Sequence, residues 1–282
     1  MKLLTYRTST GLRTGIVTDK GVVPVPHSVE EIVSGGQAIL AELNRLAKSE
    51  MEDKWLKEEE LTLGPCLPKP GKMICVGLNY RKHADETGSP IPETPILFNK
   101  FPNTLAADRD EILIPHNSKQ VDYEAELAIV IGKTAKRVSE EEALDYVFGY
   151  CTANDVSARD LQFRTNQWLL GKCCDGFSPI GPYLVTADEV GDPDNLGIRT
   201  YVNGELRQNS NTSDMIFSCR EIVSYISQHM TLSPGDIIFT GTPEGVILGY
   251  PKEKQVWLKD GDEVVIEIDK LGRLTNYMKQ EI

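Results

Sequence analysis

The sequence predicts a strand-rich α+β fold in which a small N-terminal α/β domain precedes a larger domain. Apolar runs of strand length recur through the second part of the chain, and helical patterns separate only some of them. Residues 64–71 contain three prolines and two glycines, which can continue neither a helix nor a central strand. We therefore place the domain boundary there and predict domains over residues 1–68 and 69–282.

The first domain is expected to contain a β-hairpin and a helix. Residues 1–6 and 14–18 have a strand-like pattern, and Asp19-Lys20-Gly21 supplies turn chemistry before a third apolar run. Ser28 followed by Glu31 is typical of a helix start. Apolar residues then recur at helical spacing at Ile39, Leu40, Leu43 and Leu46.

The second domain is expected to consist mainly of strands. Strands are expected at residues 73–76, 124–131, 147–152, 183–186, 198–202, 237–240 and 263–268, and helices at 139–146, 157–166 and 220–229. Asn203-Gly204 and Asp260-Gly261 are strong hairpin signals. Five prolines between residues 79 and 116 predict irregular stretches of the kind that often form lids or binding loops.

Composition and charge exclude several classes of partner. The 282 residues include 42 Asp plus Glu and 30 Lys plus Arg, a formal net charge of −12, without a basic run. Nucleic acid and an anionic membrane are therefore not expected as partners. No stretch approaches the ~18 to 20 apolar residues of a spanning helix, and the N-terminus lacks the ~7 to 15 apolar residues of a secretory signal. We expect a cytoplasmic protein whose six cysteines are reduced.

Glu124 and Glu126 lie two residues apart in an expected strand, so their carboxylates share one face. A solvated polar face is one explanation. Two observations disfavour it, because glutamate is uncommon in strands and the same face becomes apolar at Ala128 and Val130. Two carboxylates at the end of a partly buried face repel each other unless a cation lies between them.

A third carboxylate, Asp155, follows the next expected strand. As a helix N-cap it would need no further role. In a helix through this segment, however, Asp155, Arg159 and Gln162 would present an acid, a guanidinium and an amide on one face. Three carboxylates without a His or Cys cluster suit a hard divalent cation, Mg²⁺ or Mn²⁺.

His83 and Glu86 are three positions apart, so one helical turn would let the carboxylate hold and polarise the imidazole. The imidazole could then act as a general base toward water. A surface pair without a catalytic role is the alternative.

Two glycine-containing segments offer groups for an anionic ligand. Lys172 lies among glycines, where backbone can pass close to a ligand, and its charge could neutralise a substrate carboxylate or a developing enolate. Gly241 and Thr242 follow an apolar strand, and their amide and hydroxyl donors could hold an anionic group. The chain has no P-loop, no G-x-G-x-x-G after a strand and no G-x-S-x-G.

Several separated motifs appear in a particular order from residue 73 to the C-terminus. They are CVGLNY (75–80), HADE (83–86), DYEAELAIVIG (122–132), NDVSARD (154–160), QWLLGK (167–172), VNGE (202–205) and TGTPEGV (240–246). Together they resemble the fumarylacetoacetate hydrolase family. The N-terminal segment is similar to the small, variable domain of bacterial members.

The resemblance implies a mixed β-sandwich roll for the second domain and a homodimer. It also implies roles for individual residues: Mg²⁺ or Mn²⁺ held by Glu124, Glu126 and Asp155; a water-activating pair, His83 and Glu86, on a lid; and contacts to the oxo-acid end of the substrate from Lys172, Arg159, Gln162 and Thr242. The founding eukaryotic enzyme has a fourth carboxylate ligand where this chain has Leu78-Asn79. The branch with three ligands is therefore the better comparison.

The implied activity is hydrolysis of a C–C bond in a 2,4-dioxo acid, such as an acylpyruvate or a diketo-deoxy sugar acid. The metal and Lys172 would stabilise an enolate, and His83 would deliver hydroxide. Oxaloacetate decarboxylation, or a related lyase or isomerase reaction, is the alternative, because the same enolate forms there without water. A non-catalytic metal-binding dimer is a third possibility. Both enzymatic hypotheses predict a small anionic 2-oxo acid as substrate.

Overall fold

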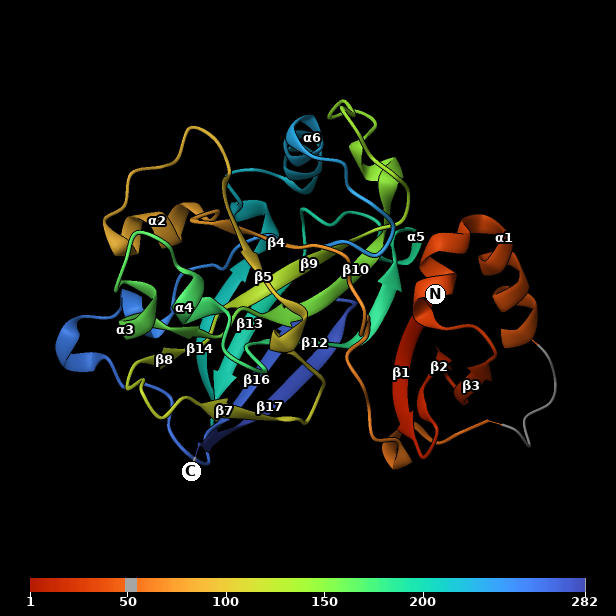
Figure 1. Cartoon of the computed structure of the whole chain (residues 1–282), viewed down its shortest axis with the longest axis horizontal. Coiled ribbons are helices and arrows are strands. Elements are labelled where there is room, and N and C mark those ends of the chain that lie inside the picture. Colours follow the sequence, from red (N-terminus) through yellow and green to blue (C-terminus); the bar gives the residue numbers. More distant parts are fainter. Residues whose placement is uncertain (49–54, 282) are drawn as a thin grey trace.

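The chain is built around two mixed sheets (Figure 1). A computed structural model describes residues 1–48 and 55–281. The main path of the ten-stranded sheet runs β3 (Gly21–Val25), β2 (Gly11–Thr18), β1 (Lys2–Thr8), β12 (Ser178–Thr186), β10 (Val147–Asn154), β9 (Ala125–Ile131), β15 (Ile237–Phe239), β4 (Met73–Gly77), β5 (Ile96–Lys100). The five-stranded sheet runs β14 (Glu205–Asn211), β13 (Gly197–Val202), β16 (Glu263–Ile268), β17 (Gly272–Gln280), β7 (Glu111–Ile114). The predicted strand-rich α+β class is confirmed.

Smaller elements connect and cover the sheets. β6 (Leu105–Ala106) pairs with β12, and β8 (Val121–Asp122) pairs with β11 (Ser157–Ala158). The α-helices are α1 (Val29–Ala47), α2 (Arg81–Thr87), α3 (Arg159–Gln162), α4 (Leu169–Lys172), α5 (Ala187–Val190) and α6 (Cys219–His229). Single 3₁₀ turns are η2 (Glu58–Glu60), η3 (Pro102–Thr104), η4 (Ala143–Tyr146), η5 (Thr212–Asp214), η6 (Ile247–Gly249) and η7 (Lys252–Lys254). None of the described helices is long and apolar enough to cross a membrane.

Strand β9 lies in the middle of the fold, and every one of its residues is buried. Leu127 and Ile129 belong to a core shared with the five-stranded sheet and α6. Ala128 and Val130 point the other way, into a core shared with the N-terminal strands and α1. Since both faces of β9 are covered, a polar group on this strand needs a partner inside the protein.

The N-terminal elements extend the large sheet, because β1 pairs antiparallel with β12. They lie at the opposite end of the molecule from α2, α3 and α4 (Figure 1). The predicted helix start is confirmed, since Ser28 and Glu31 form a reciprocal capping box at α1. The division into domains at residues 68 and 69 stays a prediction.

Three expected elements differ from the structure. Residues 139–146 form only the 3₁₀ turn η4, and residues 157–166 form β11 followed by the single turn α3. Asp260-Gly261 makes a tight turn, in which the Asp262 N–H donates to the Lys259 carbonyl. The described residues 255–259, directly before this turn, are not in a strand, so the turn does not join two strands of a hairpin. The hairpin at Asn203-Gly204 is confirmed by the pairing of β13 with β14.

Candidate functional site

The three predicted carboxylates meet because β9 and β10 are antiparallel neighbours. Glu126 is paired with Ala153, so Glu124, just before β9, lies opposite Asp155, just after β10. The backbone N–H of Asp155 donates to the Glu124 carbonyl at 2.9 Å. Ligand atoms of the three side chains all lie within 4.8 Å of one another. The adjacent ends of two neighbouring strands thus bring together carboxylates that are far apart in sequence.

Three buried cations compensate these carboxylates. Nζ of Lys172, on α4, lies 2.7 Å from both Glu124 Oε2 and Asp155 Oδ2. Lys100, at the end of β5, contacts Asp155 Oδ1 and donates to the Phe177 carbonyl at 2.7 Å. Arg159 Nη2 lies 2.6 Å from Glu124 Oε1. Each carboxylate oxygen of Glu124 and Asp155 therefore faces a cation.

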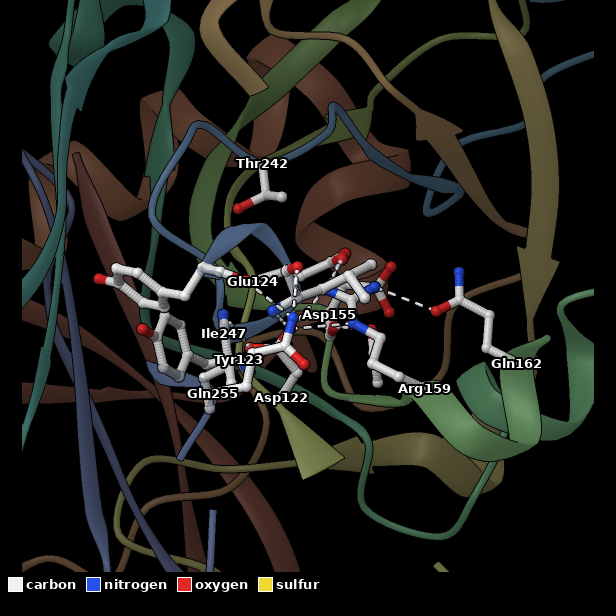
Figure 2. Close-up of polar contacts among 12 residues, drawn as sticks. Asp122, Tyr123, Glu124, Asp155, Arg159, Gln162, Thr242, Ile247 and Gln255 are labelled. Atoms are coloured by element: carbon white, nitrogen blue, oxygen red, sulfur yellow. Dashed lines mark hydrogen bonds and ion pairs between the residues drawn. The ribbon is translucent and has the colours of Figure 1, made fainter. Parts of the chain in front are cut away.

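Asp122 holds Arg159 from the other side (Figure 2). Asp122 Oδ2 accepts from Arg159 Nε at 2.9 Å, and the Asp122 carboxylate also accepts the backbone N–H groups of Ile247 and Leu248 at 2.9 and 3.0 Å. Arg159 Nη1 in turn donates to Gln162 Oε1 at 3.0 Å. One buried ion pair thus fixes the guanidinium and the loop at η6 together.

Of the three carboxylates, Glu126 is the one that makes no ion pair with the buried cations of the described residues. Burial raises the pKa of Glu124, but Arg159 and Lys172 outweigh this effect and lower the pKa to about 2. For Glu126, burial and the neighbouring Asp155 and Glu124 carboxylates raise the pKa well above its usual value. Its hydrogen-bond donor is the Gly241 N–H, at 2.8 Å. A cation among the three carboxylates would relieve this repulsion.

The donor set fits a hard divalent cation. The site gathers four buried carboxylates, counting Asp122, and the three cations Lys100, Arg159 and Lys172; none of the seven is more than 6% exposed. With all of them ionised, the formal charge is −1, which would repel an anionic substrate. A divalent ion would change that charge to +1. Glu124, Glu126 and Asp155 offer the oxygen ligands that Mg²⁺ and Mn²⁺ prefer.

Helix α2 places a histidine and a glutamate beside this cluster. His83 Nδ1 lies 2.8 Å from Glu86 Oε1, and Gly245 N–H donates to Glu86 Oε2 at 3.0 Å. Gly249 packs so closely on Glu86 that an added Cβ would lie 2.4 Å from Glu86 Cδ. Because the Glu86 carboxylate accepts, Nδ1 of His83 is the donor in this contact, and in the neutral imidazole Nε2 then has a free lone pair.

A cavity of about 700 Å³ joins most of the predicted site residues. Its lining includes His83, Glu86, Glu124, Glu126, Arg159, Gln162, Lys172, Gly241 and Thr242. Asp155 is fully buried and does not line the cavity, but it belongs to the same carboxylate cluster as Glu124 and Glu126. Aromatic side chains Phe98, Phe163, Trp168 and Tyr250 line another part of the wall. An apolar wall with a few convergent polar groups is typical of a small-molecule site.

Two local expectations are corrected by these contacts. Asp155, Arg159 and Gln162 do not share a helix face, because Asp155 precedes β11 and only the other two lie on α3. The close approach at Gly171 is made by α3 and not by a ligand, since a Cβ there would lie 2.5 Å from Gln162 N. Only glycine lets α4 pack against α3 and bring Lys172 to the carboxylates.

Sequence reasoning missed Lys100 and Asp122. Lys100 gave no signal, because nothing local distinguishes a buried lysine at the end of a strand from an exposed one. Asp122 had a weak signal, as it precedes Glu124 by two positions. The departure at Asn79 is also explained: its side chain donates to the carbonyls of Phe217 and Thr240 and lies outside the carboxylate cluster.

Comparison with known protein families identifies the family to which this fold and this site belong. Residues 72–279 match the model for the fumarylacetoacetate (FAA) hydrolase C-terminal family, and the chain belongs to that family. The predicted family is therefore confirmed.

Relatives in this family have different named activities. The mitochondrial oxaloacetate tautomerase fahd2 of Xenopus laevis is 46% identical over 256 residues, covering 89% of this chain and 78% of the relative. The solved fumarylacetoacetate hydrolase from psychrophilic Exiguobacterium antarcticum is 36% identical, with a TM-score of 0.85 and both chains covered fully. The solved 5-carboxymethyl-2-hydroxymuconate delta-isomerase from Mycobacterium smegmatis is 32% identical, with a TM-score of 0.80 and full coverage of both. These relatives are a tautomerase, a hydrolase and an isomerase.

Proposed function

We propose that this protein is an enzyme that interconverts the keto and enol forms of a small 2-oxo dicarboxylic acid of the oxaloacetate class. The observation that carries the proposal is that a carboxylate cluster and a histidine with a free Nε2 line one cavity. The relative that is 46% identical and named an oxaloacetate tautomerase supports the same reaction. Keto–enol exchange needs one group to stabilise the enolate and another to move a proton.

Mg²⁺ or Mn²⁺ is the proposed cofactor, held by Glu124, Glu126 and Asp155. A bound divalent ion would polarise the keto oxygen and make the C3 proton more acidic. The formal charge of −1 among the seven buried ionised groups supports the need for such an ion, because an anionic substrate would otherwise be repelled.

The roles proposed for the other residues follow from their contacts. His83 Nε2 removes a proton from C3, and the Nδ1 proton bound by Glu86 keeps the imidazole in the required tautomer. Lys172 balances the charge that develops on the oxygen at C2. Arg159 and Gln162, joined to each other, bind the acid oxygens of the substrate together with the Thr242 hydroxyl. Gly241 supports this wall, although its own N–H is donated to Glu126.

Hydrolysis of a C–C bond in a 2,4-dioxo acid is the second candidate. The cavity volume of about 700 Å³ favours it, since a four-carbon acid fills only part of that space. In this reaction His83 would remove a proton from water, and the hydroxide would attack the C4 carbonyl. Decarboxylation of oxaloacetate would reach the same enolate without water. The three reactions differ in what happens to C3 and not in how the oxo-acid end is held.

A homodimer in the cytoplasm is the proposed state of the protein. Strand β5 lies at one end of the large sheet, so its outer edge can accept a further strand within an assembly. Light scattering of the purified chain tests the dimer. Fractionation of the source cells tests the location, and the mitochondrial name of the Xenopus laevis relative supplies the alternative compartment.

One assay panel separates the candidate reactions. The purified protein is incubated with Mg²⁺ or Mn²⁺ and with oxaloacetate, acylpyruvates or pyruvate, and enol decay, CO₂ and pyruvate release are followed separately. We expect accelerated keto–enol exchange with oxaloacetate. Release of pyruvate from acylpyruvates at a higher kcat/KM would favour the hydrolase, and metal-dependent CO₂ release would favour the decarboxylase.

A matched pair of histidine variants tests the proposed base. His83→Ala should lower kcat by about 10² to 10⁴-fold. His116→Ala is the control, because His116 Nδ1 also lies 3.1 Å from a carboxylate, that of Glu281, but on the exposed surface. Equal activity of the two variants would exclude His83 as the proton carrier.

A further inference from the structure

Gln208 is a fully buried amide on a strand whose other residues are exposed or half-buried. Its side chain uses its whole hydrogen-bonding capacity. Nε2 donates to Thr242 Oγ1 at 2.9 Å and to the Pro243 carbonyl at 2.8 Å. Oε1 accepts from the Ala125 N–H at 3.0 Å and from Thr200 Oγ1 at 2.7 Å. One side chain of β14, in the five-stranded sheet, thus contacts both the start of β9 and the loop that carries Thr242.

The orientation of this amide is determined by its backbone partners. Ala125 N–H can only donate, so the atom facing it must be the amide oxygen. The Pro243 carbonyl can only accept, so the atom facing it must be the amide nitrogen. With both ends fixed, Gln208 must donate to Thr242 Oγ1, and the Thr242 hydroxyl acts there as an acceptor.

The proton of the Thr242 hydroxyl is consequently available to another group. Thr242 is 4% exposed and lines the cavity, and within residues 1–48 and 55–281 its hydroxyl donates no hydrogen bond. A buried hydroxyl beside a cavity gains most from an acceptor inside that cavity. An anionic substrate oxygen is an acceptor of this kind.

We propose that Gln208 is a positioning residue that fixes Thr242 as a hydrogen-bond donor to an anionic oxygen of the substrate. The same amide also accepts from the N–H of Ala125, which lies between Glu124 and Glu126. The inference rests on the proposed function only in placing a 2-oxo acid in this cavity. Gln208 itself does not line the cavity and acts through Thr242.

A double-mutant cycle between Gln208 and Thr242 tests the inference. Gln208→Leu, Thr242→Val and the double variant are compared for the KM and kcat of oxaloacetate with Mn²⁺, and for oxalate binding to the Mn²⁺-loaded protein by calorimetry. Oxalate is the probe because it carries the adjacent oxygens of a 2-oxo acid. Each single variant should raise KM and the oxalate Kd about tenfold, with kcat changed by less than about threefold.

The cycle distinguishes positioning from a structural role. If Gln208 acts through Thr242, the double variant should be no worse than Thr242→Val alone, because the donor is already missing. Thr242→Ser, which keeps the hydroxyl, should retain the KM of the unmodified protein. Multiplying effects, or a Gln208→Leu protein with unchanged KM and oxalate Kd, would overturn the inference.

Two controls keep the outcome interpretable. Thr200→Val removes a donor to the same amide oxygen without touching Thr242, so KM should change by less than about twofold. If Gln208→Leu does not fold, Gln208→Glu carries the test: it keeps the acceptor for Ala125 but removes the donor to Thr242, and should raise the oxalate Kd about tenfold. An unchanged Kd would contradict the inference.

Failure of the proposed reaction can be recognised separately. A protein that binds oxalate with Mn²⁺ but does not act on oxaloacetate would refute the tautomerase, and the oxalate cycle would still decide the role of Gln208. A protein that binds neither oxalate nor oxaloacetate in the presence of Mn²⁺ would refute both the tautomerase and the positioning role of Gln208.

Discussion

The two ends of the β9–β10 strand pair are equally buried but are stabilised in opposite ways. At one end Ile129 and Ile131 of β9 pack with Tyr150 of β10 in an apolar core. At the other end Glu124 and Asp155 are surrounded by charged side chains. Apolar packing at the first end is non-directional and needs only shape and area. At the second end each buried charge needs a partner at a particular atom.

The source of the partners differs between the ends as well. Ile129 is buried by neighbours in its own sheet and in the sheet below it. The charges at the other end depend on Lys100 from β5, Arg159 from α3 and Lys172 from α4. A change at the charged end should therefore affect metal binding and activity, and a change at the apolar end should affect stability alone.

The largest effect is expected from Glu124→Gln. Loss of this carboxylate removes a proposed ligand and leaves Arg159 paired with Asp122 alone and Lys172 with Asp155 alone, so Mn²⁺ binding by calorimetry should be abolished. Turnover should fall about a thousandfold or more, corresponding to several kcal/mol of lost transition-state stabilisation. Glu267→Gln, on a partly exposed surface pair with Arg273, is the control. Full activity of Glu124→Gln in EDTA would refute the metal assignment.

Lys100→Met should have the largest effect on folding. The substitution leaves Asp155 buried with one cation in place of two, and breaking such a pair costs about 3–5 kcal/mol in the free energy of unfolding. Chemical denaturation of the metal-free protein measures this loss. Lys57→Met, at an exposed pair with Glu60, should leave the unfolding curve unchanged. If the two variants are equally stable, Lys100 does not compensate Asp155.

Ile129→Val tests the apolar end of the same strand. Removing one buried methylene should lower the free energy of unfolding by about 1 kcal/mol. The affinity for Mn²⁺ and the kcat/KM for oxaloacetate should stay within about twofold of the unmodified values, because no charged group loses a partner. A large loss of metal affinity in this variant would show that the two ends are coupled through the strand.

Asp262 supplies the smallest expected effect, at a carboxylate held mainly by neutral donors. Burial raises the pKa of Asp262, but hydrogen bonds from Asn203 Nδ2 and Lys259 N–H outweigh it and hold the pKa below 3.8. Its contribution to stability, at most about 1 kcal/mol, is present above pH 3.8 and is lost as the pH falls through the lower pKa of the folded state. Asp262→Asn should therefore be less stable than the unmodified protein at pH 7 and should approach it at low pH. A difference that is the same at both pH values would contradict this account.

Elements with local signals were predicted well. The capping box at Ser28 and Glu31 gave the start of α1, and the Asn203-Gly204 turn gave a hairpin. Strand β17 was missed, because its buried positions are Leu274, Asn276 and Met278, separated by exposed or half-buried residues, and they form no apolar run. Residues 157–166 were predicted as a helix, but pairing of β11 with β8 overrides local propensity there.

For the candidate site, residue types were more predictable than their contacts. Period-two spacing placed Glu124 and Glu126 on one face, and i, i+3 spacing brought His83 to Glu86. Lys100 could not be identified, because its partner Asp155 lies 55 positions away in sequence. Long-range pairing of charges leaves no periodic trace in a single sequence.

By itself the sequence determined the strand-rich class, the family, and the carboxylates and His–Glu pair, because each of these depends on residue type and short spacing. Tertiary structure alone decided how the buried charges are balanced. Antiparallel pairing brings Glu126 of β9 close to Asp155, which follows β10. Lys100 of β5, Arg159 of α3 and Lys172 of α4 supply three cations at the same place. A buried charge is stabilised only within a few ångströms of its partner, and such distances between remote segments exist only in the folded chain.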